Sequence, residues 1–306
     1  SQTTGVNSGW ITNINYTFYG LTQNTTYQFR VNTKNGEGVS NTPYNLPLSC
    51  TLVNAATGVA FNNLTPTSIQ VKALGEFPPN LGSGLSAIAL EARNTDLDYS
   101  SSTWIPSNDW RTFINLSTNT AYQIRANTRN QLGITASSSS WITRYTMAAT
   151  PGVILATTTT QPTSLKIISV GANTNPTDTE FAIAIATSPL WTTTNYIQSN
   201  GSIGSSPEWG TFVSGWASNL TISGLIPDTT YYFKAVARNG NNILSAYSAT
   251  TSKATRSEIP VITSIQPHPT EGNQKLIISW TGKGSVYQVY QATYSATENN
   301  RTLLLD

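Results

Sequence analysis

Residues 225–240 read L-I-P-D-T-T-Y-Y-F-K-A-V-A-R-N-G and alternate apolar with mostly polar side chains. The apolar positions of one face are Tyr231, Phe233, Ala235 and Ala237. A period of two is typical of a half-buried strand, because successive side chains leave opposite faces of the pleat. Pro227 and Asp228 before it favour a turn, and Asn239 with Gly240 ends it. The segment therefore predicts a turn, a strand and a second turn.

The same pattern occurs twice more in the chain. The earlier copies are Leu21, Thr25, Tyr27, Phe29, Val31, Thr33 and Asn35, and then Leu116, Thr120, Tyr122, Ile124, Ala126, Thr128 and Asn130. The three tyrosines are about 100 residues apart, which is the length of a whole domain and not of a short solenoid repeat. The 306 residues are therefore predicted to form tandem domains.

The pattern L-x-P-x-T-x-Y-x-F-x-A-x-A-x-N resembles the E–F corner and F strand of fibronectin type III domains. The resemblance extends over nearly the whole chain, and Trp280 in K-L-I-I-S-W matches the tryptophan of the family's B strand. It implies an all-β fold of tandem fibronectin type III-like β-sandwiches forming a rod, with a half domain at each end. It also implies that three corner tyrosines turn their hydroxyls back to backbone groups upstream: Tyr27, Tyr122 and Tyr231.

The strand pattern divides the chain into four parts. Residues 1–53 contain only the C-terminal half of a domain, with an E-like strand over 10–18, an F strand over 25–34 and a last strand over 44–52. Residues 54–149 and 150–257 each form a full domain, joined by short Pro-containing linkers that favour a stiff rod. Residues 258–306 form the N-terminal half of a domain, with strands A, B and C.

Composition limits the classes of function. Sixteen basic and fourteen acidic residues leave a thinly spread net charge of +2, which does not favour nucleic acid. No apolar run is long enough for membrane insertion. The single cysteine, Cys50, excludes an intrachain disulfide and is interpreted as a packing residue, the alternative being a reactive or intermolecular thiol. Scarce Cys, Met and charge favour an extracellular or cell-surface protein of prokaryotic or viral origin.

No pattern in the sequence indicates catalysis, a cofactor or a resident metal. His268 is the only histidine and lies between two prolines, so we interpret it as a turn residue. Asn94, Asp96 and Asp98 have the spacing of a calcium loop but lack its glycine and its final carboxylate, which favours a solvated loop. Asp178 and Glu180 are a carboxylate pair that could serve glycoside hydrolysis, but exposed edge charges are the preferred interpretation.

Two sets of residues are candidates for contact with sugars. Seven sequons, about as many as chance gives, are candidate glycosylation sites: Asn15, Asn24, Asn63, Asn115, Asn200, Asn219 and Asn300. Three tryptophans in loop-like stretches are candidates for exposed aromatic contacts with a ligand or a neighbouring domain: Trp104, Trp191 and Trp209.

Two functions follow as hypotheses. The first is a structural segment or subunit of an extracellular filament, stalk or adhesin, built head-to-tail from fibronectin type III-like domains. The second is a spacer or carbohydrate-binding module of a larger secreted polysaccharide-active enzyme. In the first, residues 258–306 pair with residues 1–53 of the next copy, or the chain is a window cut from a longer array. Surface glycans are a further candidate partner.

Overall fold

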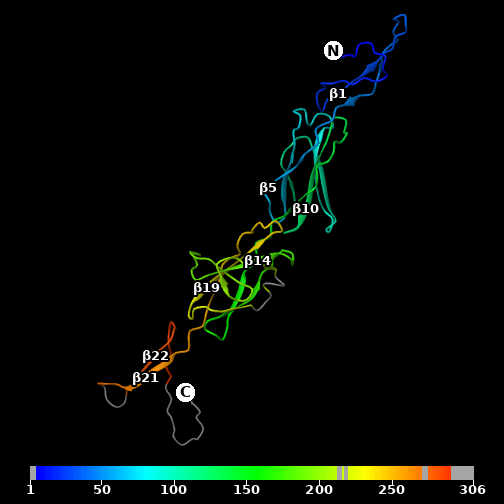
Figure 1. Cartoon of the computed structure of the whole chain (residues 1–306). Helices are drawn as coiled ribbons and strands as arrows, with labels where there is room; N and C mark the ends of the chain where they lie inside the picture. Colours follow the sequence, from blue (N-terminus) through cyan, green and yellow to red (C-terminus); the bar gives the residue numbers. More distant parts are fainter. Residues whose placement is uncertain (1–4, 212–215, 217–219, 271–274, 291–306) are drawn as a thin grey trace. The chain divides into compact units, whose positions relative to one another are not determined.

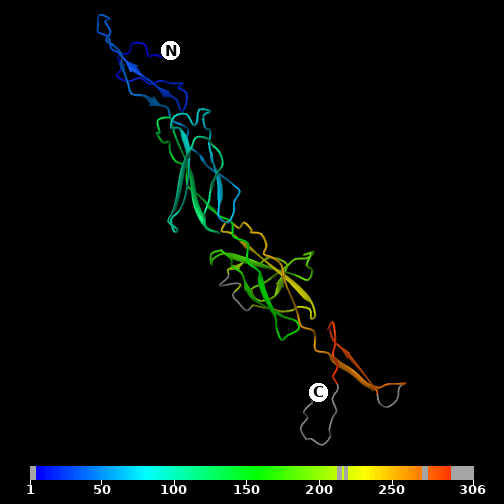
Figure 2. The ribbon, with the colours of Figure 1, turned by 180° about the vertical axis from the view of Figure 1, so that it is seen from behind.

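The computed structural model describes residues 5–211, 216, 220–270 and 275–290, and it divides into two units, residues 1–147 and 148–306. The described residues form strands, turns and loops and no helix (Figure 1). The first unit contains one two-layered sandwich and two small two-stranded sheets, and the second unit contains one two-layered sandwich and one two-stranded hairpin (Figures 1 and 2).

The first unit contains a sandwich of seven strands. Its three-stranded sheet has the order β5-β6-β9, and its four-stranded sheet the order β11-β10-β7-β8. The strands are β5 (Gly58–Asn62), β6 (Ile69–Leu74), β7 (Ala87–Asn94), β8 (Tyr99–Ile105), β9 (Arg111–Phe113), β10 (Ala121–Arg129) and β11 (Ile142–Tyr145). The inward faces of both sheets form one core, centred on Ile69, Val71, Ile88, Tyr122 and Ile124.

The second unit repeats this arrangement. One sheet has the order β12-β13-β18, and the other β16-β15-β14-β19-β20 with β17 also paired to β14. The strands are β12 (Ile154–Thr158), β13 (Leu165–Val170), β14 (Glu180–Ala186), β15 (Asn195–Ile197), β16 (Ile203–Gly204), β17 (Gly210–Thr211), β18 (Leu220–Ile222), β19 (Thr230–Arg238) and β20 (Thr251–Ala254). Leu165, Phe181, Trp216 and Phe233 lie in its core.

Each sandwich has the sheet composition of a fibronectin type III fold. In sequence order the first, second and fifth main strands form one sheet, and the remaining ones form the other. All neighbouring strands are antiparallel, and one face of each sheet lies in the core. The central strand β14 is buried on its outer face as well, at Ala182, Ala184 and Ala186. The period-two pattern of the sequence is the direct cause, since it supplies one apolar face per strand.

Residues 5–53 form much less sheet than the sequence predicts. The only strands are pairs of residues, β1 (Thr26–Tyr27), β2 (Arg30–Val31), β3 (Tyr44–Asn45) and β4 (Ser49–Cys50), with β1 paired to β4 and β2 to β3. The predicted E-like strand over residues 10–18 is not formed, and that prediction is wrong. Its physical cause is the missing partner: β9, the corresponding strand of the complete sandwich, pairs with β6, and these residues have no such neighbour.

Residues 258–290 form a single hairpin. It joins β21 (Val261–Pro267) to β22 (Leu276–Thr281), which carry the predicted A and B strands. The predicted C strand from Val286 is absent over residues 286–290, and Gln291 lies outside the described residues. In the complete sandwiches the corresponding strands β7 and β14 pair with β10 and β19. Within the described part of the chain the hairpin has no third strand beside it.

Candidate functional site

The three predicted corner tyrosines all bond to the backbone five residues upstream. The hydroxyl oxygens of Tyr27, Tyr122 and Tyr231 accept hydrogen bonds from the N–H groups of Thr22, Ser117 and Ile226 at 2.8, 2.9 and 2.9 Å. A buried phenol oxygen needs such a partner, and the bond fixes the path of the chain into the strand. The corner is therefore the same local structure in both sandwiches and in the N-terminal segment.

A threonine that the sequence analysis did not single out completes each corner. It stands at the end of the last strand, at Thr51, Thr146 and Thr255. Each Oγ1 donates at 2.6–2.7 Å to the carbonyl of the residue whose N–H bonds to the corner tyrosine: Thr22, Ser117 or Ile226. Each Oγ1 also accepts at 3.0 Å from the N–H of the threonine two residues before that tyrosine: Thr25, Thr120 or Thr229. The repeat of a threonine 29 residues after its carbonyl partner was the available signal.

The N-terminal corner, which contains Tyr27, docks against the sandwich that follows it in the first unit. Asn24 is fully buried, and its Nδ2 donates to the backbone oxygen of Asn80 at 3.0 Å, while the Nδ2 of Asn80 donates to the backbone oxygen of Asn24 at 2.9 Å. The N–H of Gln131 donates to Oδ1 of Asn24 at 3.1 Å. The Nδ2 of Asn130 donates to the carbonyls of Cys50 and Thr51, both at 3.3 Å. Two loops of one sandwich thus bind one corner.

The corner in the second unit is bonded in the same way to the hairpin that follows. Asp228 stands where Asn24 stands in the first unit, and both have a left-handed backbone with φ of 50°. Its carboxylate accepts hydrogen bonds from the hydroxyls of Ser285 at 2.6 Å and Ser257 at 3.5 Å. The N–H of Glu258 donates to the carbonyl of Lys283 at 3.0 Å. A polar side chain at this corner position is therefore a docking group in both units.

The three candidate tryptophans do not form open aromatic platforms. All are half-buried, Trp104 lies within β8 and not in a loop, and each has a cation over its ring. Arg129 lies 4.4 Å from the Trp104 ring centre, Lys234 3.9 Å from that of Trp191, and Arg238 4.6 Å from that of Trp209. Cation–π contacts of this kind cover one face of each ring. The expectation of exposed rings is corrected accordingly.

Charges on the outer sheet faces are arranged as cross-strand pairs. Glu91 on β7 accepts from Arg125 on β10 at 2.6 Å, and Glu180 on β14 contacts Arg238 on β19 at 2.5 Å. β14 has paired strands on both sides, so the interpretation of Glu180 as an edge charge is wrong. Asp178 lies in the turn before β14 and is exposed, whereas Glu180 lies within the strand. Glu180 is thus an ion-pair partner of Arg238 on the neighbouring strand.

Two groups on the outer face of the second sandwich have shifted pKa values. Lys234 lies between the Trp191 and Tyr247 rings, and burial lowers the pKa of its amine. Burial raises the pKa of Tyr247 to about 12, with the hydrogen bond between its hydroxyl and that of Tyr196 acting in the same direction. Both pKa shifts follow from the packing of these side chains against one another on the sheet.

The remaining candidate residues have structural partners. Asn94 ends β7, and its Oδ1 accepts from the N–H of Leu97 at 2.9 Å in the hairpin turn to β8, where Asp98 has a left-handed backbone. His268 directly follows β21, and its N–H donates to the carbonyl of Lys275 at 3.0 Å. Cys50 is a half-buried free thiol on β4. Over the described ranges, no three His, Cys, Asp or Glu side chains group as metal ligands.

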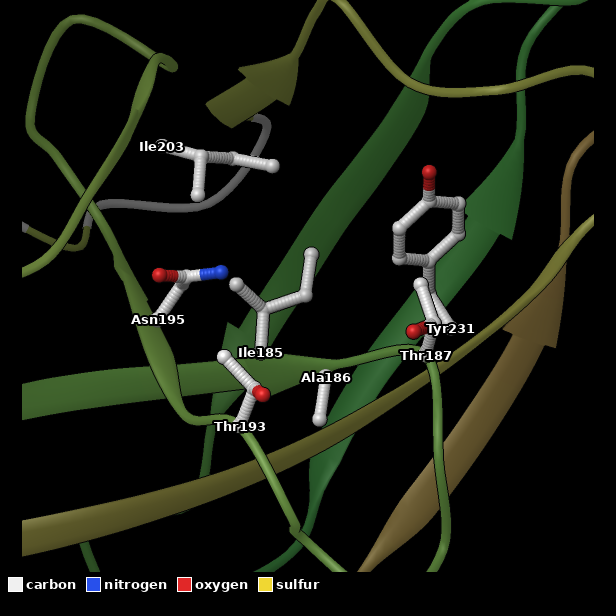
Figure 3. A pocket seen from close by; sticks show the side chains of 7 residues that line it. All are labelled: Ile185, Ala186, Thr187, Thr193, Asn195, Ile203 and Tyr231. Atoms are coloured by element: carbon white, nitrogen blue, oxygen red, sulfur yellow. The ribbon is translucent and has the colours of Figure 1, made fainter.

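A cavity of about 280 Å³ lies beside the end of β14 in the second sandwich (Figure 3). The ring of Tyr231 stands on one side and Asn195 with Ile203 on the other, as the close view shows. The complete lining is Ile185, Ala186, Thr187, Thr193, Asn195, Ile203 and Tyr231. Its one ionisable group is the Tyr231 phenol, which already accepts the corner hydrogen bond. The cavity therefore holds no nucleophile paired with a base.

The sequons differ in exposure. Asn15, Asn63, Asn115 and Asn200 are exposed, whereas Asn219 and Asn300 lie outside the described residues. Asn24 is 0% exposed and both ends of its amide are hydrogen bonded, so a glycan on Asn24 is incompatible with the docked corner. Among the described residues there is also no helix long and apolar enough to cross a membrane.

Comparison with known proteins gives structural likenesses and no sequence match. No protein-family model matches the chain, and no curated protein matches it significantly. A two-domain fibronectin type III segment of chicken tenascin aligns with a TM-score of 0.39 and 14% identity, over 65% of this chain and 99% of that one. The FN1–FN3 domains of chicken CNTN1 align with a TM-score of 0.31 and 14% identity, over 77% and 79%. These scores are too low to carry any inference about function.

The fold itself is that of tandem fibronectin type III-like sandwiches, as the resemblance in sequence predicted. The strand order of each sandwich and the three tyrosine corners support it independently of the likenesses. What the sequence analysis missed are the docking asparagines Asn80 and Asn130 and the basic residues over the tryptophans. The repeated asparagine after each F strand was a signal for Asn130.

Proposed function

We propose that this chain is a structural segment or subunit of an extracellular filament, stalk or adhesin. In this proposal the hairpin region 258–306 of one copy completes the sandwich of residues 1–53 of the next copy. The observation that supports it is complementary strand content. The N-terminal segment has the corner, F strand and last strand of a sandwich, and the hairpin has strands A and B.

Exposed apolar side chains at the equivalent core positions support the same pairing. Val31 is 55% exposed, whereas Ala126 and Ala235 at the matching positions of β10 and β19 are 0% exposed. Leu276 on β22 is 66% exposed, whereas Leu165 on β13 is 0% exposed. Covering one such side chain contributes about 1.5–3 kcal/mol. Two half-cores of this kind favour association with each other over exposure to water.

The contact would be head-to-tail, because the two surfaces are different and lie on different segments. A heterologous contact that does not close into a ring propagates as an open filament. Unpaired backbone on β22 and β1 would gain ladder hydrogen bonds in the same step, as in recognition by strand addition. The low charge and the single cysteine agree with an extracellular structural role that needs no catalysis.

The hypothesis of a carbohydrate-binding module receives less support. Its best candidates were the three tryptophans, and each has a cation stacked on one ring face and is half-buried. A flat sugar-stacking surface needs open, coplanar rings. We therefore propose only the structural function.

Sedimentation velocity over a range of concentrations, together with electron microscopy, tests this proposal. We expect end-to-end oligomers that grow with concentration. Val31→Lys places a charge on the core face and should abolish them, whereas Asn32→Lys places the same charge on the opposite face of the strand and should not. A chain that stays monomeric, or oligomers unaffected by Val31→Lys, would contradict pairing with a second copy.

A further inference from the structure

The loop that follows the F strand is the same local structure three times. In each copy an asparagine Oδ1 accepts hydrogen bonds from the N–H groups two and four residues later, at 2.9–3.1 Å. The asparagines are Asn35, Asn130 and Asn239. A residue with positive φ stands three positions later in each loop, at Gly38, Gly133 and Asn242. Loop residues can therefore be matched one to one, and Gly36 matches Gln131.

One of these loops is seen docked. The loop of Asn130 uses its free amide nitrogen to donate to two carbonyls at the end of the preceding last strand, those of Cys50 and Thr51. The next residue, Gln131, donates its N–H to the corner side chain Asn24 and contacts Thr26 Oγ1 through its own side chain at 3.0 Å. Because the Oδ1 of Asn130 accepts hydrogen bonds within the loop, its side chain recognises the neighbour through Nδ2.

Strand register gives the equivalent target in the second unit. Tyr27 pairs with Ser49 across β1 and β4, and Tyr231 pairs with Lys253 across β19 and β20. Ala254 and Thr255 therefore correspond to Cys50 and Thr51. Asp228 corresponds to Asn24. The hydroxyl of Ser285, which follows β22 of the hairpin, already donates to the Asp228 carboxylate. Among the described residues of this segment, 258–270 and 275–290, no F–G loop binds the rest of this corner.

We infer that the loop of Asn35 docks onto the Asp228 corner of a neighbouring copy. The Nδ2 of Asn35 donates to the carbonyls of Ala254 and Thr255, and the N–H of Gly36 donates to the Asp228 carboxylate. Asn35 is exposed in the isolated chain, so its amide is available. This inference rests on the proposed head-to-tail function and names the residues that align one copy on the next. An N–H bond to a carboxylate is charge-assisted and stronger than a neutral one.

Asn35→Asp is the variant that isolates this role. The aspartate keeps the Oδ1 acceptor for the loop's own N–H groups, but it loses the donor and faces two carbonyl oxygens and Asp228. Asn41→Asp is the matched control, since its Oδ1 accepts from the N–H of Thr33 at 2.7 Å in the same segment. Measured by sedimentation on the full chain, we expect Asn35→Asp to weaken head-to-tail association about tenfold or more and Asn41→Asp to leave it unchanged.

Chemical crosslinking gives an independent measurement. In a Cys50→Ser background, cysteines at Gly36 and Thr230 should join successive copies into covalent multimers with a short bismaleimide. Gly36 has open space around its Cβ position, so the substitution fits. Cysteines at Thr26 and Gln131, the matching pair inside one chain, should crosslink without forming multimers and so calibrate the reach.

The outcomes separate the two proposals. One outcome overturns the docking loop alone. In it the wild type associates and Val31→Lys abolishes the association, but Asn35→Asp does not weaken it and the 36–230 cysteine pair gives no multimers. A wild type that does not associate overturns both. Weakened association of Asn35→Asp together with multimers from the 36–230 pair supports the inference.

Discussion

The N-terminal segment 5–53 and the sandwich of residues 150–257 contain the same corner but differ in nearly everything around it. Both have the tyrosine bond, the threonine that closes the last strand and the asparagine loop after the F strand. The sandwich runs its F strand unbroken from Thr230 to Arg238, whereas the segment has only two-residue strands there.

This difference separates local from non-local structure. The tyrosine bond and the asparagine loop join residues at most five positions apart and need no second sheet. Strands need a paired backbone on at least one side and a covered apolar face, and both come from distant parts of a sequence. In the described residues of the two end segments each strand has only one partner strand, so the turns are formed while the sheets stay small.

The largest expected effect is in the core. Phe233→Ala should cost the 150–257 sandwich about 3–5 kcal/mol, because the ring is fully buried in a close-packed interior. Phe29→Ala at the matching position should cost the lone chain about 1 kcal/mol or less, since Phe29 is half-buried and contacts only Phe18 and Tyr27 among rings. Urea unfolding, with hydrogen exchange to assign each transition, measures both. Equal costs would contradict the contrast, and a cost for Phe29→Ala that grows on association would sharpen it.

An intermediate effect is expected at the corner itself. Tyr231→Phe should lower the free energy of unfolding by about 1 kcal/mol or more, because the N–H of Ile226 loses its partner while the ring stays packed. Tyr27→Phe should cost less, because the N–H of exposed Thr22 can bond to water instead. The urea midpoint of the same transition is the measurement. An unchanged midpoint for Tyr231→Phe would remove the corner as a source of stability.

The smallest effect concerns the outer face that only the complete sandwich has. The folded-state pKa of Tyr247 is raised to about 12 from an ordinary value of 10.0, so folding favours the protonated phenol. Its contribution to stability is fully present below pH 10 and is lost as the pH rises toward 12. Tyr247→Phe should remove this pH dependence, and Lys234 is common to both proteins. Unfolding free energies of the two proteins, compared from pH 9 to about 12, are the readout; parallel curves would be the contrary result.

Much of the fold could be predicted from the sequence, because period-two alternation and turn residues are local signals. The strands β10 and β19 lie where the alternation placed them, and the corners at Tyr122 and Tyr231 are those that the resemblance to fibronectin type III domains implied. The E-like strand over 10–18 and the C strand from Val286 were mispredicted, since alternation reports the preference of a segment and not the presence of its partner.

The docking residues were harder to predict for a related reason. Asn24 reads as a sequon in an exposed turn, and only the approach of Asn80 from another domain buries it. The cations over Trp104, Trp191 and Trp209 come from β10 and β19, strands that are distant in sequence from the rings. Glu180 reads as an edge charge until the register of β14 and β19 sets it opposite Arg238. Each of these is a contact between strands or domains.

The placement of the basic side chains has a consequence for proteolysis. Arg93, Arg125, Arg129, Lys234 and Arg238 lie on the paired strands β7, β10 and β19, where Trp104, Trp141, Trp191 and Trp209 stack on them. A trypsin-like protease needs an unpaired, extended peptide around the basic residue, and these bonds become available only when the strand opens. Resistance to digestion at these sites is therefore set by the stability of the sheet, in a chain whose 16 basic residues already leave few sites to cut.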